Sequence, residues 1–310
     1  MTVANSSSAS PFTSSCVLTL SILTEDYLLE TSIFFLMAIT LNIASCPFTI
    51  LMNVLVIVAV KTRRQLQTNY NVLLACWAVT DLLVGVFVQP IFAVALITVL
   101  KGSLTYYCQF FVTFSKLLFI PFAASLFHLA LLSAERYAAM KFPFRYPDFV
   151  TTFRIKIAVS FSWLACIVNA LPYTGVIATV VGPIYFTFRV LSVATIVYFH
   201  ISVYIVTRRH EKQIQAEQVS PEALAKFLEE KRALKTTTII IGVFLLCYLP
   251  FVVIGTVRGD LLKKSLVSVT LSLLQPLLLS SSLINSLCNP LVYCFRNKEL
   301  RKVFIELLQD

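Results

Sequence analysis

Seven long runs of apolar residues, separated by short polar segments, dominate the sequence. They lie near residues 32–60, 70–97, 104–138, 154–178, 183–207, 234–257 and 266–294. A helix rises about 1.5 Å per residue, so about 20 apolar residues cross the hydrocarbon core of a bilayer. The pattern predicts an all-α membrane protein in which seven transmembrane helices form a bundle.

The two ends of the chain have different patterns. Residues 1–31 are rich in Ser and Thr and contain no Lys or Arg, and Asn5 begins an Asn-Ser-Ser glycosylation motif. Over residues 297–308, apolar residues recur at helical spacing among basic ones, which predicts an amphipathic helix in the membrane interface. We therefore expect an extracellular tail (1–31), a seven-helix domain (32–295), and an interfacial helix with a cytoplasmic C-terminus (296–310).

Composition and charge place the chain in a membrane and orient it. Hydrophobic residues make up 58% and charged residues 13% of the sequence, whereas a soluble domain has about 25% charged residues. With the N-terminus outside, eighteen Lys and Arg residues fall in the inner loops and tail, and six on the outer side. The positive-inside rule therefore predicts an extracellular N-terminus. The net charge of +10 does not indicate nucleic-acid binding, because the basic residues lie in short loops between apolar runs.

The third apolar run ends in Glu135-Arg136-Tyr137, which the charge pattern places at the cytoplasmic boundary. A carboxylate and a guanidinium where hydrocarbon meets water are costly unless each has a use. Two interpretations fit these three residues alone: a solvated acid–base pair that marks the membrane edge, or a functional switch.

Several polar residues lie in the middle of apolar runs, where each needs a partner away from water. They are Asn53, Asp81, Ser125, Asn285, Ser286 and Asn289. Asp81 is the only carboxylate deep in any run, and Ser125 lies eleven residues before Arg136, about 20° from the same helix face. One buried acid among hydroxyl and amide oxygens can bind a small hydrated cation. A network of hydrogen bonds between helices is the alternative, and spacing alone favours it.

The ordered set of motifs on these runs resembles the rhodopsin-like (class A) G-protein-coupled receptors. It comprises Asn53, Asp81, Glu135-Arg136-Tyr137, Trp163, Cys247-Tyr248-Leu249-Pro250 and Asn289-Pro290-Leu291-Val292-Tyr293. The resemblance covers about residues 32 to 308. It implies a receptor in the plasma membrane that converts binding of an extracellular ligand into activation of a heterotrimeric G protein, with arrestin as a further partner.

The resemblance also implies roles for residues at the cytoplasmic end. In the inactive state Arg136 is held by Glu135 and by Glu230, which lies twenty residues before Pro250. Activation moves the sixth span outward and frees Arg136. The remaining implied roles belong to two tyrosines that support the freed arginine and to a bulky loop residue that inserts into the G protein: Tyr204, Tyr293 and Phe144.

For the mid-membrane polar residues, the resemblance implies a sodium site and reverses the preference stated above. Its ligands would be Asp81, Ser125, Asn285, Ser286 and Asn289. We expect no other cofactor.

Departures from the family pattern narrow the ligand. Leu118 stands where amine receptors carry an Asp, and Leu283 where opsins carry the retinal Lys, so neither a protonated amine nor covalent retinal is expected. Tyr248 replaces the usual Trp of the sixth span, which puts the family's activation toggle in doubt. The connection near residues 179–183 is short and has no cysteine. It hints at the melanocortin, cannabinoid and lysophospholipid receptors.

The outer cysteines leave two alternatives open, because Cys108 either pairs with Cys16 in the tail or stays free.

The predicted ligand pocket is apolar and aromatic, with one cation. Its residues are Phe111, Ser115, Leu118, Phe122, Arg189, Phe244, Tyr248 and Phe251. Arg189 either binds a carboxylate or phosphate of the ligand or extends to the outer headgroups. We expect an acidic amphiphile as the ligand, with a peptide that carries an acidic group at one end as the alternative.

A seven-span transporter or an ion- or proton-translocating protein is the alternative function. Such a protein needs a chain of ionisable groups through the bilayer, and repeats or broken helices. Here one buried acid stands alone and we find no internal repeat. No metal-ligand spacing, nucleophile elbow or phosphate loop indicates an enzyme.

Overall fold

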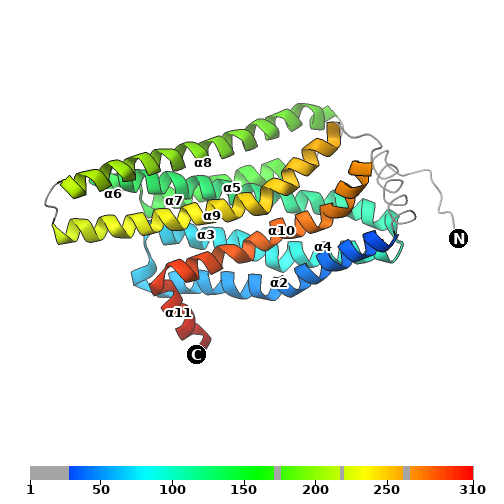
Figure 1. The fold of residues 1–310 in the computed structure, drawn as a ribbon, viewed down its shortest axis with the longest axis horizontal. Helices are drawn as coiled ribbons and strands as arrows, with labels where there is room; N and C mark the ends of the chain where they lie inside the picture. Colours follow the sequence, from blue (N-terminus) through cyan, green and yellow to red (C-terminus); the bar gives the residue numbers. More distant parts are fainter. Residues whose placement is uncertain (1–27, 171–175, 217–219, 261–265, 310) are drawn as a thin grey trace.

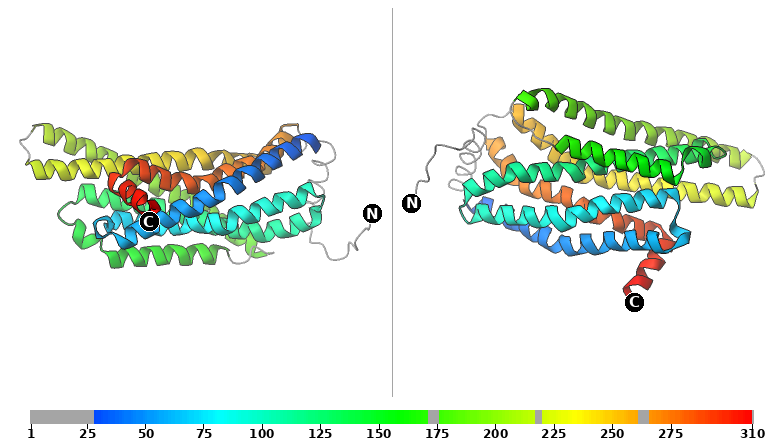
Figure 2. Two further views of the ribbon diagram at one scale, coloured as in Figure 1. Left: turned by 90° about the horizontal axis from the view of Figure 1, so that it is seen from below. Right: turned by 180° about the vertical axis from the view of Figure 1, so that it is seen from behind.

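A computed structural model describes residues 28–170, 176–216, 220–260 and 266–309. Side chains at some positions within these helices lie outside the description, chiefly 109–119, 176–186, 188–189 and 251–260 except 253. The long helices are α2 (Leu28–Thr62), α5 (Leu104–Lys141), α7 (Thr152–Ala170), α8 (Val176–Ala216), α9 (Pro221–Asp260) and α10 (Leu266–Arg296). They run roughly side by side as a bundle (Figures 1 and 2).

The second span is built from three segments, α3 (Asn69–Leu83), a π-helical turn η2 (Val84–Val88) and α4 (Gln89–Leu100). Pro90 follows the π turn; it has no N–H to donate and its ring crowds the preceding turn. The Gln89 N–H accordingly reaches back to the carbonyl of Val84, the longer spacing of a π-helix. Three short elements complete the described residues: η1 (Arg64–Leu66), α6 (Tyr146–Phe149) and α11 (Lys298–Gln309).

The predicted all-α class is confirmed. With α3, η2 and α4 taken as one span, the described part of the chain holds seven long helical spans and contains no strand. Five helical stretches within that part are long and apolar enough to cross a membrane.

The predicted boundary between the fourth and fifth spans is wrong. We expected a connection near residues 179–183, but α7 ends at Ala170 and α8 begins at Val176. Residues 176–181 are as apolar as the span before them, so hydropathy alone cannot place the break. Pro172 marks it instead, because a helix usually ends at or before the residue that precedes a proline.

A close approach of helices positions the polar residues of the bundle. At Gly85 in η2, a Cβ atom would lie 3.1 Å from side-chain atoms of both Thr49 and Ile50 on α2. The Cys46 thiol donates to the Gly85 carbonyl at 3.2 Å. Glycine therefore lets the second span pack directly against the first, beside the buried Asn53 and Asp81.

Helices α8 and α9 extend past the other helices at the end of the bundle opposite the N-terminus (Figure 1). Ser220 caps the start of α9, and its hydroxyl accepts the Ala223 N–H at 3.3 Å. Lys231 on α9 forms an ion pair with Glu211 on α8, which ties the two extensions together.

The helix predicted for residues 297–308 is α11, which leaves the end of α10 at a steep angle to the bundle (Figure 1). Asn297 caps it: the side-chain oxygen accepts the N–H groups of Glu299 and Leu300 at 3.1 and 3.2 Å. Its apolar face is buried at Leu300 and Phe304. Arg63, in the loop after α2, forms an ion pair with Glu306 at 2.7 Å.

Of the two alternatives for the outer cysteines, the structure has Cys108 in a disulfide bond. Six other cysteines are free thiols. Cys16 lies outside the described residues.

Candidate functional site

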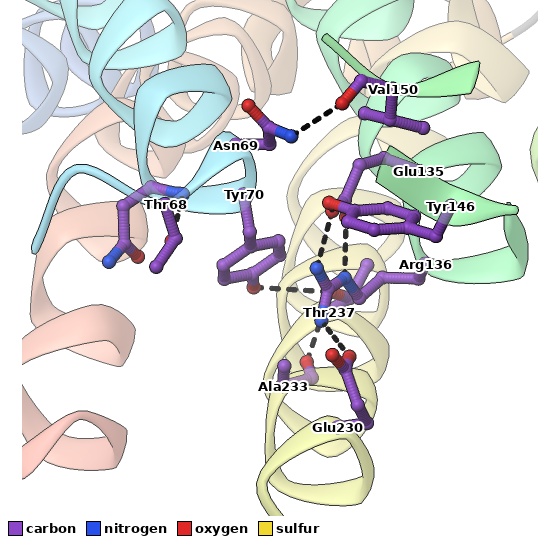
Figure 3. Close-up of polar contacts among 11 residues, drawn as sticks. Thr68, Asn69, Tyr70, Glu135, Arg136, Tyr146, Val150, Glu230, Ala233 and Thr237 are labelled. Atoms are coloured by element: carbon purple, nitrogen blue, oxygen red, sulfur yellow. Dashed lines mark hydrogen bonds and ion pairs between the residues drawn. The ribbon is translucent and has the colours of Figure 1, made fainter. Parts of the chain in front are cut away.

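Arg136 near the end of α5 lies in a cluster of paired charges, which we call the Arg136 clasp. Glu135 grips it through two contacts of 2.5 Å, from Nε and Nη2 to the two carboxylate oxygens. Glu230 on α9 accepts a third hydrogen bond from Nη1, also at 2.5 Å. The side chains of Glu135 and Arg136 are almost fully buried, whereas that of Glu230 is partly exposed. The clasp thus joins α5 to α9 through a buried guanidinium (Figure 3).

Two tyrosines that the sequence did not single out complete the clasp. The ring of Tyr70, in the first turn of α3, lies with its centroid 4.4 Å from the Arg136 guanidinium carbon. Tyr146 in α6 donates to Glu135 at 2.6 Å. Burial, and next the Glu135 carboxylate, raise the pKa of Tyr146, which keeps it a neutral donor. Both residues come from other segments than Arg136, so no spacing along its helix could have revealed them.

The loop that carries Tyr146 is anchored to the second span. The Asn69 amide donates to the Val150 carbonyl at 2.7 Å, and Thr152 donates to the Asn69 side chain at 3.4 Å. Two adjacent residues of the second span therefore meet this loop and Arg136, respectively (Figure 3).

The other predicted switch residues lie away from the Arg136 guanidinium. Tyr204 on α8 is 55% exposed, and its hydroxyl accepts a hydrogen bond from Arg208 at 3.1 Å. Tyr293 on α10 is buried. Tyr137 packs at 5.4 Å from the ring of Phe199. Phe144 is 96% exposed in the loop between α5 and α6.

The mid-membrane polar residues gather around Asp81, where α3, α5 and α10 face one another with α2. Asn289 donates to Asp81 Oδ2 at 2.8 Å, and Ser286 also bonds to this carboxylate. Asn53 donates to the Ser286 carbonyl at 3.1 Å. Ser125 accepts the Trp77 indole N–H at 3.3 Å, so its hydroxyl proton remains for another partner.

Several buried acceptors of this polar cluster are not reached by a donor of the described residues. Among the described residues, the buried oxygens Asp81 Oδ1, Asn285 Oδ1 and Asn289 Oδ1 have no hydrogen-bond partner within the protein. A buried polar atom without a partner is costly. Carboxylate, amide and hydroxyl oxygens are the ligands that a hard cation prefers, so the residues present fit a bound cation.

Three aromatic side chains pack together between the third and sixth spans. The ring of Tyr248 lies 3.6 Å from that of Phe122 and 4.2 Å from that of Phe244, centroid to centroid. Tyr248 is buried and therefore occupies the packed position between α5 and α9. The other predicted pocket side chains lie outside the described residues: Phe111, Ser115, Leu118, Arg189 and Phe251. Asn5 is outside them too.

A bundle of membrane-spanning helices with a buried arginine clasp at one end is the architecture of a seven-helix receptor. A family model described as 7 transmembrane receptor (rhodopsin family) matches residues 52–181 and 175–293. These segments make up most of the chain, which therefore belongs to this family.

Three receptors are similar to this chain over a large part of their length. The adenosine receptor A2a of Canis lupus familiaris is 27% identical over 304 residues, which cover 88% of this chain and 72% of that receptor. Trace amine-associated receptor 9 of Rattus norvegicus is 26% identical over 279 residues, covering 81% of the chain and 80% of the relative. The alpha-1A adrenergic receptor of Oryzias latipes is 28% identical over 313 residues, which cover 84% of this chain and 64% of that receptor.

The chain is thus a G-protein-coupled receptor and a multi-pass membrane protein. Its family consists of receptors rather than enzymes, so the prediction that it is no enzyme is confirmed, and a transporter is not favoured. The family implies an extracellular ligand and coupling to a G protein. The resemblance to the melanocortin, cannabinoid and lysophospholipid group stays a prediction.

Proposed function

We propose that this receptor is held inactive by the Arg136 clasp and is activated when α9 moves away from α5. The observation that carries the proposal is the pair of contacts from one buried guanidinium to Glu135 on its own helix and to Glu230 on α9. A ligand that favours the separated state releases Arg136 toward the G protein. Hydrogen bonds between charged groups contribute roughly 1.5–3 kcal/mol, enough to bias such an equilibrium without locking it.

In this proposal the other switch residues act after release. Tyr204 and Tyr293 turn toward the freed Arg136 and replace the lost carboxylate contacts. Phe144, which is exposed in the inner loop, inserts into the G protein. The same opened face receives arrestin. The receptor resides in the plasma membrane, with a glycosylated N-terminus outside and the clasp inside, as the basic loops indicate.

The substitution Glu230→Ala tests the clasp. It removes the ion pair between Arg136 and α9, so ligand-independent G-protein signalling should rise several-fold at equal surface expression. Glu229→Ala is the matched control, because Glu229 is the neighbouring carboxylate and is exposed. If basal signalling of Glu230→Ala equals that of the control, Glu230 has no part in the switch.

A sodium ion between α3, α5 and α10 fits the polar cluster, and we propose it as an allosteric ligand. The unpaired oxygens of Asp81, Asn285 and Asn289 would bind it, together with the hydroxyls of Ser125 and Ser286. The cation would supply positive charge to the buried Asp81 carboxylate and favour the inactive packing of these helices.

For the extracellular ligand we propose an acidic amphiphile, with an apolar body against the aromatic residues of α5 and α9 and an acidic group near Arg189. The packed rings of Phe122, Phe244 and Tyr248 support an apolar floor of the pocket. The relatives are named for adenosine, trace amines and adrenergic ligands. An amine is not favoured here, because Leu118 offers no carboxylate.

A screen of fatty acids, lysophospholipids and acidic peptides in cells with a promiscuous G protein tests the ligand class. The variant Arg189→Ala should lower the potency of an active acidic compound at least tenfold, because it removes the proposed counter-charge. Lys101→Ala removes an exposed cation in the turn after α4 and is the matched control. Unchanged potency in Arg189→Ala would remove Arg189 as the anchor and leave headgroup contact as its role.

A further inference from the structure

Tyr70 makes two different contacts, one through its ring and one through its hydroxyl (Figure 3). The ring lies over the Arg136 guanidinium, and the hydroxyl oxygen lies 3.2 Å from Thr237 Oγ1 on α9. Thr237 donates its own proton to the Ala233 carbonyl at 3.1 Å. Tyr70 is therefore the donor and Thr237 the acceptor. Tyr70 and Thr237 are both buried, so this hydrogen bond is shielded from water.

The ring contact complements the carboxylate contacts. Glu135 and Glu230 bind the guanidinium through its N–H groups, which lie in the plane of the group. The flat face of the guanidinium makes no such hydrogen bond, and an aromatic ring is well suited to cover it. Tyr70 covers this face, and by the same side chain it reaches α9.

The two α9 partners of this region lie on one face of the helix. Thr237 follows Glu230 by seven residues, which is two turns and about 20° from the same direction. One displacement of α9 away from the bundle therefore separates Glu230 from Arg136 and Thr237 from Tyr70 together. The contacts of Glu230 and Thr237 therefore respond to the same movement of α9, at positions two turns apart along the helix.

We propose that Tyr70 is a positioning residue of the switch, which holds the Arg136 guanidinium in the clasp and bonds α3 to α9 in the inactive state. The proposal rests on the proposed role of the clasp and extends it from two helices to three. In it the second span has a direct part in holding the sixth, through one hydrogen bond that activation must break. The hydroxyl and the ring make separable contributions.

Basal signalling of four variants tests the hydroxyl contact. Tyr70→Phe keeps the ring over Arg136 and removes the donor, whereas Thr237→Val keeps the shape and removes the acceptor. Each should raise ligand-independent signalling about two- to tenfold at equal surface expression, the range of one net hydrogen bond. The double variant should rise no further than the larger single one, because both remove the same bond. Thr236→Val is the control, since Thr236 likewise bonds its own helix, at the Arg232 carbonyl.

The direction of the effect separates positioning from mere packing. A packing defect lowers surface expression and thermal stability and lowers signalling per cell, whereas release of α9 raises signalling per receptor. A fluorophore on a cysteine introduced at the exposed position 222 of α9 gives a second readout. In purified receptor without ligand, Tyr70→Phe and Thr237→Val should shift its emission in the direction that a G protein does.

Comparison with Glu230→Ala makes the two proposals independent. If Glu230→Ala raises basal signalling and both hydroxyl variants match Thr236→Val, the role of Tyr70 is overturned and the clasp stands. If the hydroxyl variants raise signalling without additivity and Glu230→Ala does not, the α3–α9 bond stands and Glu230 loses its role. Basal signalling unchanged in all of them, or additive effects of Tyr70→Phe and Thr237→Val, overturns the proposal for Tyr70.

Discussion

The Arg136 clasp and the polar cluster around Asp81 are both buried arrays of polar groups, yet they differ in how completely their atoms are paired. In the clasp, three guanidinium nitrogens bond to two carboxylates, and Tyr146 adds a donor to Glu135. In the cluster, Asp81 uses one carboxylate oxygen on Asn289, and its other oxygen has no partner within the described residues.

This difference means that the clasp is complete without a ligand, whereas the polar cluster around Asp81 can bind one. In the clasp both carboxylates and the guanidinium are paired within the protein, so its stability depends on the relative positions of α5, α9 and the inner loop. The cluster has an unbalanced carboxylate and spare acceptors, which require a cation, a proton or water to be satisfied. We therefore expect the clasp to respond to helix movement. The cluster should instead respond to the concentration of the cation or proton that binds there.

The largest effect on signalling should come from removal of the Arg136 guanidinium from the clasp. Arg136→Ala eliminates the group that the G protein would meet and leaves the buried Glu135 carboxylate without its partner. Stimulated G-protein activation per surface receptor should fall by more than about tenfold. Cell-based G-protein dissociation, normalised to surface labelling, measures it.

The double variant Glu135→Gln with Arg136→Ala is the control for stability. It removes both charges, so a folded receptor that still fails to signal identifies the loss of the arginine itself. Normal activation by either variant would contradict the switch.

The second prediction concerns the polar cluster around Asp81. Asp81→Asn replaces the carboxylate by a neutral amide of the same size, so it should abolish the response to sodium. In the unmodified receptor, exchange of potassium for sodium should lower agonist affinity about five- to tenfold when sodium is well above its dissociation constant. Radioligand competition or a signalling assay in the two salts measures the shift.

Potassium and a large organic cation at the same ionic strength control for screening of charge. The sodium proposal fails if the unmodified receptor gives the same affinity in all three salts. It also fails if Asp81→Asn keeps the full sodium response.

A third prediction concerns Tyr293, which is buried on α10. Its buried hydroxyl has no hydrogen-bond partner among the described residues. Tyr293→Phe therefore removes no inactive-state bond, and the melting temperature of the purified receptor should stay the same or rise. If Tyr293 supports the freed arginine, stimulated signalling should still fall about three- to tenfold. A fall in melting temperature would show that the hydroxyl already bonds in the inactive state.

The smallest expected effect is that of Tyr146→Phe. The Tyr146 hydroxyl is one of several donors to Glu135, and Arg136 keeps its two contacts with that carboxylate. Basal signalling should rise no more than about twofold to threefold, less than for Glu230→Ala. A larger rise than in Glu230→Ala would mean that the inner loop, rather than α9, holds the clasp.

Much of the fold and part of the site followed from sequence, for different reasons. Long apolar runs are forced on any helix that crosses a bilayer, so the spans were readable from hydropathy. The end of α7 was misplaced because residues 176–181 are as apolar as the span before them, so hydropathy does not mark the break. Glu230 was found through the family resemblance, because it stands twenty residues before Pro250, where the family places a second acid for the arginine, and the structure has the ion pair to Arg136.

Contacts between separate helices could not be read in the same way. Tyr70 and Tyr146 carry no motif, and their approach to the clasp depends on how the second span and the inner loop pack. The π-helical turn before Pro90 was likewise missed, although a proline inside a helical run indicates that the regular hydrogen bonding is interrupted nearby. It changes the phase of the second span, which no fixed helical period can reproduce.

The unbroken length of α9 has a mechanical consequence. Pro250 and Glu230 lie twenty residues apart in this helix, which corresponds to a lever arm of about 30 Å. A bend of about 10° at the proline would carry the Glu230 end sideways by about 5 Å, because a rigid rod multiplies angle by length. That displacement exceeds the reach of an ion pair formed at 2.5 Å. A rearrangement of the rings packed around Tyr248 that bent α9 by this angle would therefore separate Glu230 from Arg136 through the length of the helix alone.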